Sequence, residues 1–158
     1  MSQVQAISPC LWFTSLAEEA ANFYVSVFPD SRIDERVRWP EGFFAPAGSV
    51  LTVRFTLAGQ EFIALNGGQD FPFTEAVSLS VRCETQPELD FFWDSLGDGG
   101  STGQCGWLKD RYGLSWQIVP TALTDILGGA DRDRAARIMQ AMMPMTKLDI
   151  ATLLKAAG

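Results

Sequence analysis

The chain of 158 residues contains no histidine at all. Without an imidazole, neither a Ser–His nor a Cys–His nucleophile can be assembled. Zinc sites built from histidine, alone or together with cysteine, are excluded for the same reason. The three cysteines, Cys10, Cys83 and Cys105, are an odd number without paired spacing. They argue against a disulfide framework and favour a reducing, cytoplasmic environment.

Basic residues and long apolar runs are also scarce. Twelve Lys and Arg against 19 Asp and Glu give a net charge of -7. Such an acidic surface disfavours nucleic acid and anionic membranes, because phosphate binding needs clustered Lys and Arg. No apolar run approaches the ~20 residues that span a bilayer, and no signal-peptide pattern opens the chain. We therefore expect a cytoplasmic protein with neither nucleic-acid nor membrane partners.

A repeated pattern dominates what is present. A short apolar stretch at 6–13 precedes the capping box Ser15–Glu18 and an amphipathic helix. Alternating apolar residues at 77–83 precede a second capping box, Thr85–Glu88, and a second amphipathic helix. The landmarks of the two segments recur at about seventy residues, which indicates an internal duplication.

Each predicted helix is followed by predicted strands. In the first half they cover 32–39, 51–57 and 62–66. In the second half they cover 105–109 and 114–119, and we expect the glycine-rich stretch before them to replace one strand. Three further helices are predicted after Pro120.

The predicted fold class is α+β, with two βαβββ-type modules that form a cupped mixed sheet, followed by C-terminal helices. The first module covers about 4–68 and the second about 75–120. Together they make a duplicated domain at 1–120, and 121–158 is a helical extension whose helices are expected at 121–127, 132–143 and 145–157.

Four segments carry a resemblance to a known family: Phe23–Pro29, Phe62–Gly68, Gly106–Pro120 and Lys147–Ile150. With the duplicated module, they resemble the vicinal oxygen chelate superfamily, which includes glyoxalase I and the bleomycin-resistance proteins. More narrowly, the chain resembles the branch called 3-demethylubiquinone-9 3-methyltransferase-like, or PhnB-like. The resemblance covers nearly the whole chain, and Gly106–Pro120 is its most specific part.

The resemblance implies a cupped pocket in which metal-dependent members hold a divalent cation by four side chains. Laid on this chain, those positions are Pro9, Ala64, Ser78 and Gln117, and Gln117 takes the place of a metal-binding glutamate. Proline and alanine offer no side-chain donor, and serine and glutamine are weak neutral ligands. Because divalent cations prefer charged oxygens, imidazole or thiolate, we expect neither a metal nor another cofactor.

The cup itself is expected to bind a small molecule. Strand alternation places Leu11 and five candidate ligand-binding residues on the side of the lost metal ligands; the five are Phe13, Asn66, Ser78, Ser80 and Gln117. Apolar walls with a few neutral hydrogen-bonding groups are typical of small-molecule sites. The alternative is that Phe13 fills the core and that the serines lie on a solvated sheet face.

Other functions stay open at this point, including whether the chain is an enzyme. A metal-dependent lyase, isomerase or dioxygenase would need carboxylates at unrelated positions, such as Glu61, Asp70, Glu75 or Asp110. The branch name implies a methyltransferase, for which Gly97–Gly103 is a weak cofactor-loop candidate because it follows a helix. A structural or interaction module is the last alternative. Superfamily members commonly pair, so we expect a homodimer.

Overall fold

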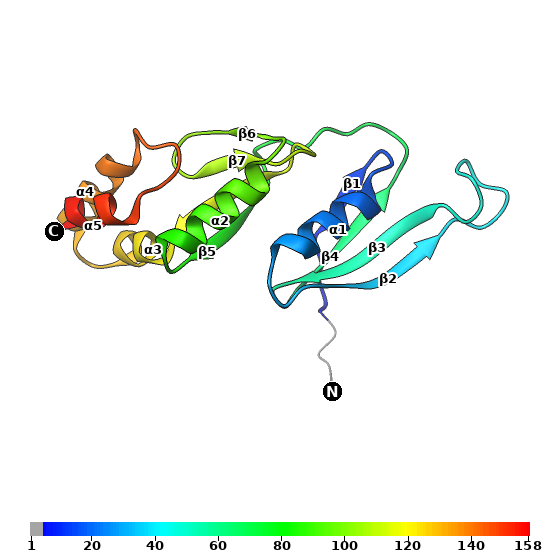
Figure 1. Cartoon of the computed structure of the whole chain (residues 1–158), viewed down its shortest axis with the longest axis horizontal. Coiled ribbons are helices and arrows are strands. Elements are labelled where there is room, and N and C mark those ends of the chain that lie inside the picture. Colours follow the sequence, from blue (N-terminus) through cyan, green and yellow to red (C-terminus); the bar gives the residue numbers. More distant parts are fainter. Residues whose placement is uncertain (1–4) are drawn as a thin grey trace. The chain divides into compact units, whose positions relative to one another are not determined.

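The structure, a computed structural model, describes residues 5–158. Its contacts divide the chain into two compact units, Met1–Pro72 and Phe73–Gly158. Among the described residues there are two four-stranded mixed sheets, one in each unit, and five helices (Figure 1). The predicted α+β class and the duplicated strand–helix–strands pattern are therefore confirmed. Each unit is described by itself below.

The first unit is one βαβββ module. Its elements are β1 (Cys10–Phe13), α1 (Ala17–Val27), β2 (Arg32–Arg38), β3 (Val50–Leu57) and β4 (Gln60–Asn66). The strand order is β1-β4-β3-β2; β1 runs parallel to β4 and the other neighbours are antiparallel. The predicted turn between β3 and β4 is formed by Ala58 and Gly59, both with positive φ, as a two-residue hairpin requires.

One face of the first sheet packs on α1, which lies along β3 and β4 (Figure 1). The ring of Tyr24 stacks on Phe55 with 6.3 Å between centroids, and Phe55 stacks on Phe62 at 5.6 Å. Val53 and Ala64 are fully buried beside them. This apolar contact fixes which face of the sheet is inside the unit and which is open.

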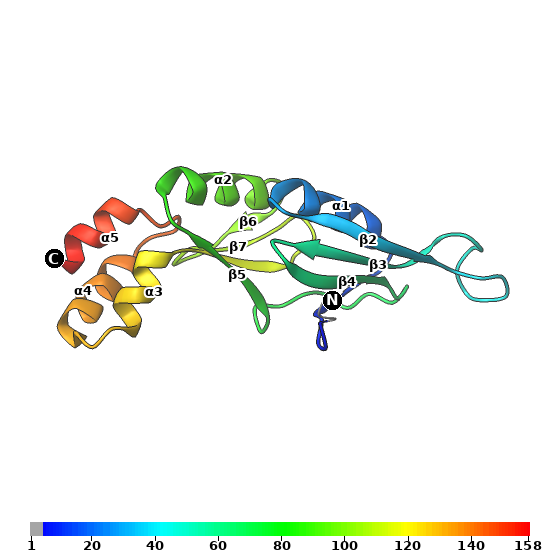
Figure 2. The ribbon, with the colours of Figure 1, turned by 90° about the horizontal axis from the view of Figure 1, so that it is seen from below.

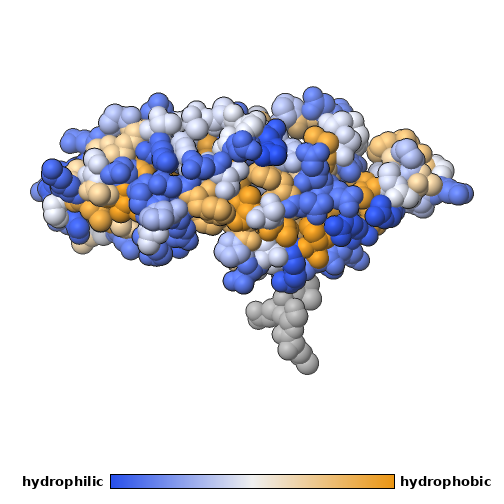
Figure 3. All heavy atoms as spheres, in the orientation of Figure 1, coloured by the Kyte–Doolittle hydropathy of each residue, from blue (hydrophilic) through white to orange (hydrophobic). Residues whose placement is uncertain are grey.

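The loop between β2 and β3 carries an aromatic cluster. The ring of Trp39 lies 5.7 Å from that of Phe43 and 4.7 Å from that of Phe44. Phe43 and Phe44 are nevertheless 61% and 70% exposed. The loop is the group of spheres at the right-hand end of Figure 3, in which pale orange and white are prominent. The rest of the visible surface mixes hydrophilic and hydrophobic residues.

The second unit repeats the module with shorter strands. Its elements are β5 (Ser78–Cys83), α2 (Gln86–Gly97), β6 (Ser101–Thr102), β7 (Trp107–Lys109) and β8 (Ser115–Pro120), in the order β5-β8-β7-β6. The expectation that the second half loses a strand is wrong, because β6 pairs antiparallel with β7. Gly100 permits this, since a Cβ there would clash with the backbone oxygen of Lys109.

Helix α2 covers one face of the second sheet. Its buried side chains are Leu89, Phe92, Trp93 and Leu96. The sheet presents Leu108, Trp116 and Ile118 to that helix, and each of the three is at most 2% exposed. Residues that alternate with these lie on the opposite face.

Three helices complete the second unit: α3 (Thr121–Gly128), α4 (Arg132–Met142) and α5 (Ile150–Ala157), which lie together beyond the end of β8 (Figure 2). The helix predicted from residue 145 begins only at Ile150, because the Asp149 carboxylate caps it by accepting from the Thr152 N–H at 2.7 Å. The preceding segment is not helical. Its Met145 and Thr146 carbonyls accept hydrogen bonds from the backbone before β7.

The two predicted capping boxes differ in outcome. Thr85 Oγ accepts from the Glu88 N–H at 3.4 Å, so the N-cap half of the second box forms, but the Glu88 carboxylate accepts from the Glu84 N–H at 2.8 Å and not from that of Thr85. The first box does not form, because Leu16 and not Ser15 occupies the N-cap of α1, which has no side-chain cap of its own. Instead Asn66 Oδ1, from the end of β4, accepts from the Ala17 N–H at 2.9 Å. A tertiary contact thus replaces the local cap.

Candidate functional site

The second sheet has an open face, directed away from α2. Six residues of three neighbouring strands share it by register and alternation: Ser78, Ser80, Trp107, Lys109, Ser115 and Gln117. We call these six residues the open face. The set includes the three candidate residues that the sequence places in the second module, so the structure brings Ser78, Ser80 and Gln117 together.

A neutral pair lies at the centre of the open face. Gln117 Nε2 donates to Ser78 Oγ at 2.9 Å, and both side chains are half-buried. Ser80 is the register partner of Gln117 on β5 and is exposed. The hydrogen bond orients the Gln117 amide and leaves its carbonyl oxygen to accept from another group.

A cavity of about 520 Å³ lies beside the register partners of this pair. Its walls come from β6, β7, the segment between them, the start of β8 and Glu75; the residues are Glu75, Ser101, Thr102, Gly103, Gln104, Cys105, Trp107, Leu108, Lys109 and Ser115. Trp107 is the cross-strand partner of Gln117, and Ser115 is the register partner of Ser78. The volume lies within the range of small-molecule pockets, about 300–1,000 Å³.

Polar side chains form much of the cavity wall. Lys109 Nζ lies 2.9 Å from Glu75 Oε1. The hydrogen bond from Lys109 is the main cause that lowers the pKa of the Glu75 carboxyl below its usual value, and a backbone hydrogen bond adds to it. Ser115 is 1% exposed, and its hydroxyl has no hydrogen-bond partner among the described residues. A bound molecule would meet this ion pair, the unpaired Ser115 hydroxyl and the Trp107 indole, together with the polar side chains of Ser101, Thr102 and Gln104.

Comparison with known proteins places this arrangement in a family. The model of the family described as 3-demethylubiquinone-9 3-methyltransferase matches residues 5–119. The chain belongs to this family. This family is the PhnB-like branch of the vicinal oxygen chelate superfamily, as the sequence resemblance predicted. The match ends just before α3, so the three C-terminal helices lie beyond it.

Solved structures agree with the assignment. A putative 3-demethylubiquinone-9 3-methyltransferase, PhnB protein, from Bacillus cereus is 38% identical, with a TM-score of 0.69 over 74% of this chain and 100% of that one. Protein PA1353 from Pseudomonas aeruginosa is 18% identical, with a TM-score of 0.59 over 72% of this chain and 95% of that one. Fosfomycin resistance protein FosX from Mesorhizobium loti is 14% identical, with a TM-score of 0.52 over 87% of this chain and 100% of that one. The last two show the fold alone. None of the curated proteins matches this chain.

In this PhnB-like chain, the candidate residues of the first module lie on a different kind of face. Leu11 pairs with Ala64 and Phe13 with Asn66, all on the face that α1 covers. Leu11 and Phe13 are each 6% exposed. The expectation that they share an open side with Ser78 and Gln117 is therefore wrong, and Phe13 packs in the core of its unit.

Asn66 is engaged within the first unit. Besides capping α1, its Nδ2 donates to the Val50 carbonyl at 3.1 Å. Asn66 also borders a smaller cavity of about 290 Å³ beside the aromatic loop and the start of α1. Its amide joins three elements, which explains a polar residue at this position without a ligand.

A one-residue shift explains the misplacement. Leu11 and Ala64 are partners under α1 in the first sheet, as Val81 and Ile118 are in the second. Ser80 and Gln117 pair one position before Val81 and Ile118, just as Cys10 and Ile63 pair one position before Leu11 and Ala64. The first-unit counterparts of Ser80 and Gln117 are therefore Cys10 and Ile63, whereas Pro9 and Ala64 are in phase with the covered face. Because side chains alternate with a period of two, a shift of one residue moves the whole set to the other face.

The donors of this site do not fit a divalent cation. Ser78 and Gln117 are neutral and bond each other, and Ile63 has no donor atom. Among residues 5–158 there is no cluster of three or more His, Cys, Asp or Glu that could hold a metal ion. Such cations need several charged or soft ligands. We therefore derive no chemical step through a metal.

Three of the four carboxylates considered as alternative metal ligands, Asp110, Glu61 and Glu75, have other partners. Asp110 is 2% exposed and accepts from the backbone of Tyr112 and from the indole N–H of Trp116, each at 2.8 Å. It supports the turn before Gly113, as expected. Glu61 accepts from Ser8 Oγ at 2.7 Å and Glu75 pairs with Lys109.

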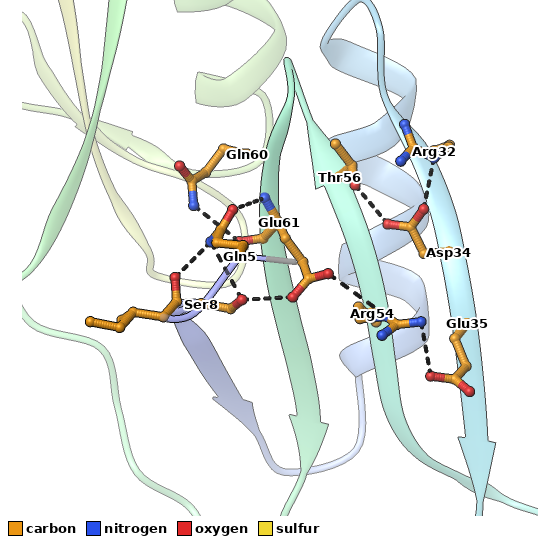
Figure 4. A network of polar contacts seen from close by, with 10 residues as sticks. Gln5, Ser8, Arg32, Asp34, Glu35, Arg54, Thr56, Gln60 and Glu61 are labelled. Carbon is orange, nitrogen blue, oxygen red and sulfur yellow. Dashed lines mark hydrogen bonds and ion pairs between the residues drawn. The ribbon is translucent and has the colours of Figure 1, made fainter. Parts of the chain in front are cut away.

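Glu61 is also part of a network that the sequence did not indicate. Figure 4 shows polar side chains of β4, β3 and β2 joined across the first sheet by hydrogen bonds and ion pairs. Arg54 lies between Glu35 at 3.3 Å and Glu61 at 3.9 Å. The network compensates charge on the face of the first sheet that α1 leaves open.

Membrane-spanning helices are absent from the part of the chain that the structure describes, since none of its helices combines the necessary length with sufficient hydrophobicity.

Proposed function

We propose that this PhnB-like chain binds a small organic molecule in the cavity of the second unit without a metal ion. The Gln117–Ser78 pair carries the proposal. Its position corresponds to metal-binding positions of the superfamily, but a neutral amide and hydroxyl stand there, and their register partners Trp107 and Ser115 line a cavity of about 520 Å³. Neutral groups that bond each other can orient a ligand, but they cannot hold a cation.

Binding without turnover is favoured over covalent catalysis. Cys105 lines the cavity, but the chain has no histidine to activate its thiol. Its Sγ lies 3.6 Å from the carbonyl oxygen of Met143. Cys83 is fully buried, and burial, followed by the nearby Glu88 charge, raises its pKa to about 12. A thiol with so high a pKa is a poor nucleophile at neutral pH.

Methyl transfer, which the family name mentions, has less support. Nucleotide-containing cofactors are typically held by a glycine-rich turn between a strand and the following helix. In this chain Gly97–Gly103 leaves α2 and enters β6, which is the reverse order. A homodimer and a cytoplasmic location stay predictions from the sequence.

Thermal unfolding of EDTA-treated protein tests the proposal. Mg, Mn, Zn, Ni and Co are added in turn, followed by a library of soluble small molecules. A ligand at 100 times its dissociation constant adds ~2.7 kcal/mol, or roughly 5–10 °C for a chain of this length. We expect no such shift with any metal and a shift with some organic molecules.

Two variants connect the result to the site. Gln117→Leu keeps the side-chain volume but removes the amide, and it should abolish the shift with organic ligands. Gln60→Leu, on the exposed hairpin of the first unit, should leave it unchanged. A stabilising metal whose effect disappears with Glu61→Gln, Asp70→Asn or Glu75→Gln would contradict the proposal and indicate a metalloenzyme.

A further inference from the structure

We infer that the cavity of the second unit recognises an aromatic carboxylate, with the carboxylate group bonded to Lys109 and Ser115 and the ring against Trp107. This inference rests on the small-molecule function proposed above and names its ligand class. It uses Trp107 together with two residues of the open face, Lys109 and Ser115, that the sequence did not single out.

Lys109 and Ser115 are placed to act on the same group. They are register partners across the antiparallel strands β7 and β8. Side chains of such partners lie on one face with their Cβ atoms about 5 Å apart. Both residues line the cavity. An ammonium and a hydroxyl at this spacing can donate to the two oxygens of one carboxylate.

The Ser115 hydroxyl is the strongest sign of a missing partner. Ser115 is 1% exposed, and its Oγ makes no hydrogen bond with any residue in 5–158. A buried polar group without a partner is destabilising. Because Ser115 lines the cavity, a ligand that accepts a hydrogen bond there would remove this destabilisation, which an apolar ligand could not do.

Lys109 supplies the charge that selects an anion. Its ammonium lies 2.9 Å from Glu75 Oε1, but the two side chains are 36% and 64% exposed. Exposed ion pairs contribute little to stability, so Glu75 is a weak competitor for Lys109. Glu75 precedes β5 and is not itself on a strand. A ligand carboxylate bonded to both Lys109 and Ser115 would make the stronger, charge-assisted contact.

Trp107 specifies the rest of the ligand. It lies two residues before Lys109 on β7, on the same face, and its half-buried indole lines the cavity. Aromatic rings that stack on an indole gain attraction beyond that of the area that they bury. Its cross-strand partner Gln117 offers a carbonyl oxygen for a polar substituent of the ring.

Matched pairs of probes test the ligand class. Benzoate and benzamide, and 1-naphthoate and 1-naphthamide, have the same rings with and without a charge. We would measure dissociation constants by NMR titration of the wild-type protein up to ~10 mM, a range that weak ligands require. Each acid should bind at least about 10-fold more tightly than its amide, as a charge-assisted contact predicts.

Variants assign the preference to the residues. Lys109→Gln should remove the preference for the acid, Lys109→Arg should retain it, and Ser115→Ala should weaken acid binding about fivefold. Glu75→Gln removes the competitor and should tighten acid binding. Lys155→Gln, on the exposed surface of α5, is the matched control and should change nothing.

The outcomes separate the two proposals. Equal binding of acids and amides, unaffected by Lys109→Gln, would overturn the carboxylate class and leave small-molecule binding intact. Binding of neither member of any pair would count against the aromatic carboxylate and also against the cavity as a binding site. The Lys109→Arg variant guards against misfolding, because loss of binding in Lys109→Gln together with retention in Lys109→Arg cannot come from a collapsed cavity.

Discussion

Asn66, at the end of β4, shows how one side chain can serve the fold where the sequence indicates a ligand site. Its amide accepts from Ala17 at the start of α1 and donates to Val50 of β3. Three elements of the first unit therefore meet at one residue. Ser15, which matches the local capping pattern, makes no cap hydrogen bond.

Asn66→Ala should lower the free energy of unfolding by about 2 kcal/mol, about one for the lost helix cap and one for the bond to Val50. Ser15→Ala, the control, should change it by less than about 0.5 kcal/mol, as exposed substitutions usually do. Urea unfolding of both variants checks this. Equal effects would mean that Ser15 caps α1 after all.

At the scale of elements, the short strand β7 depends on how the chain enters it. Gly106, directly before β7, has a φ of +82°, and a Cβ there would lie 2.8 Å from the Ile118 oxygen and 3.0 Å from the Leu148 side chain. Its N–H donates to the Thr146 carbonyl at 2.8 Å. The entry to the strand is thus packed against both β8 and the segment before α5.

Gly106→Ala should cost about 2–4 kcal/mol, from the left-handed backbone and from overpacking. Gly113→Ala is the matched control, because Gly113 has a φ of +85° but no atom within 4 Å of its added Cβ. It should cost only about 1–2 kcal/mol. Chemical denaturation distinguishes the two, and equal losses would show that the backbone conformation alone decides.

At the scale of the whole molecule, the C-terminal helices lie outside the matched family region but are held against the rest of the second unit. Gln86, in the first turn of α2, holds them through its amide. Its Nε2 donates to the Leu148 carbonyl at 3.1 Å, and its Oε1 accepts from the Ile150 N–H at 2.8 Å. Lys147 pairs with Asp90 of the same helix at 3.1 Å.

Gln86→Ala should therefore destabilise the protein by about 2 kcal/mol, through two lost hydrogen bonds, and loosen α5 before the rest of the unit unfolds. Gln60→Ala is the control, because within residues 5–158 that side chain bonds only the adjacent Glu61 carbonyl, at 3.3 Å. Hydrogen exchange should show faster exchange in α5 for Gln86→Ala alone. Uniformly faster exchange would contradict a local role.

The sequence by itself determined the duplication, the helices and most of the strands, because these depend on local periodicity and on turn and cap residues. Thr85 and Glu88 formed the cap that their spacing predicts, and Ala58 and Gly59 formed the expected turn. It also determined the family and the neutral residues at 78 and 117, since these are properties of residue identity alone.

Only the tertiary structure decided which side chains meet. Strand phase relative to the helix moved Phe13 and Asn66 to the covered face, although a shift of one residue leaves the local pattern nearly unchanged. The partners of Asn66, Gln86 and Ser115 lie many residues away along the chain or, for Ser115, are missing among the described residues. Hydrogen bonds and cavities depend on such distant contacts, so the face that forms the candidate site became visible only in the folded chain.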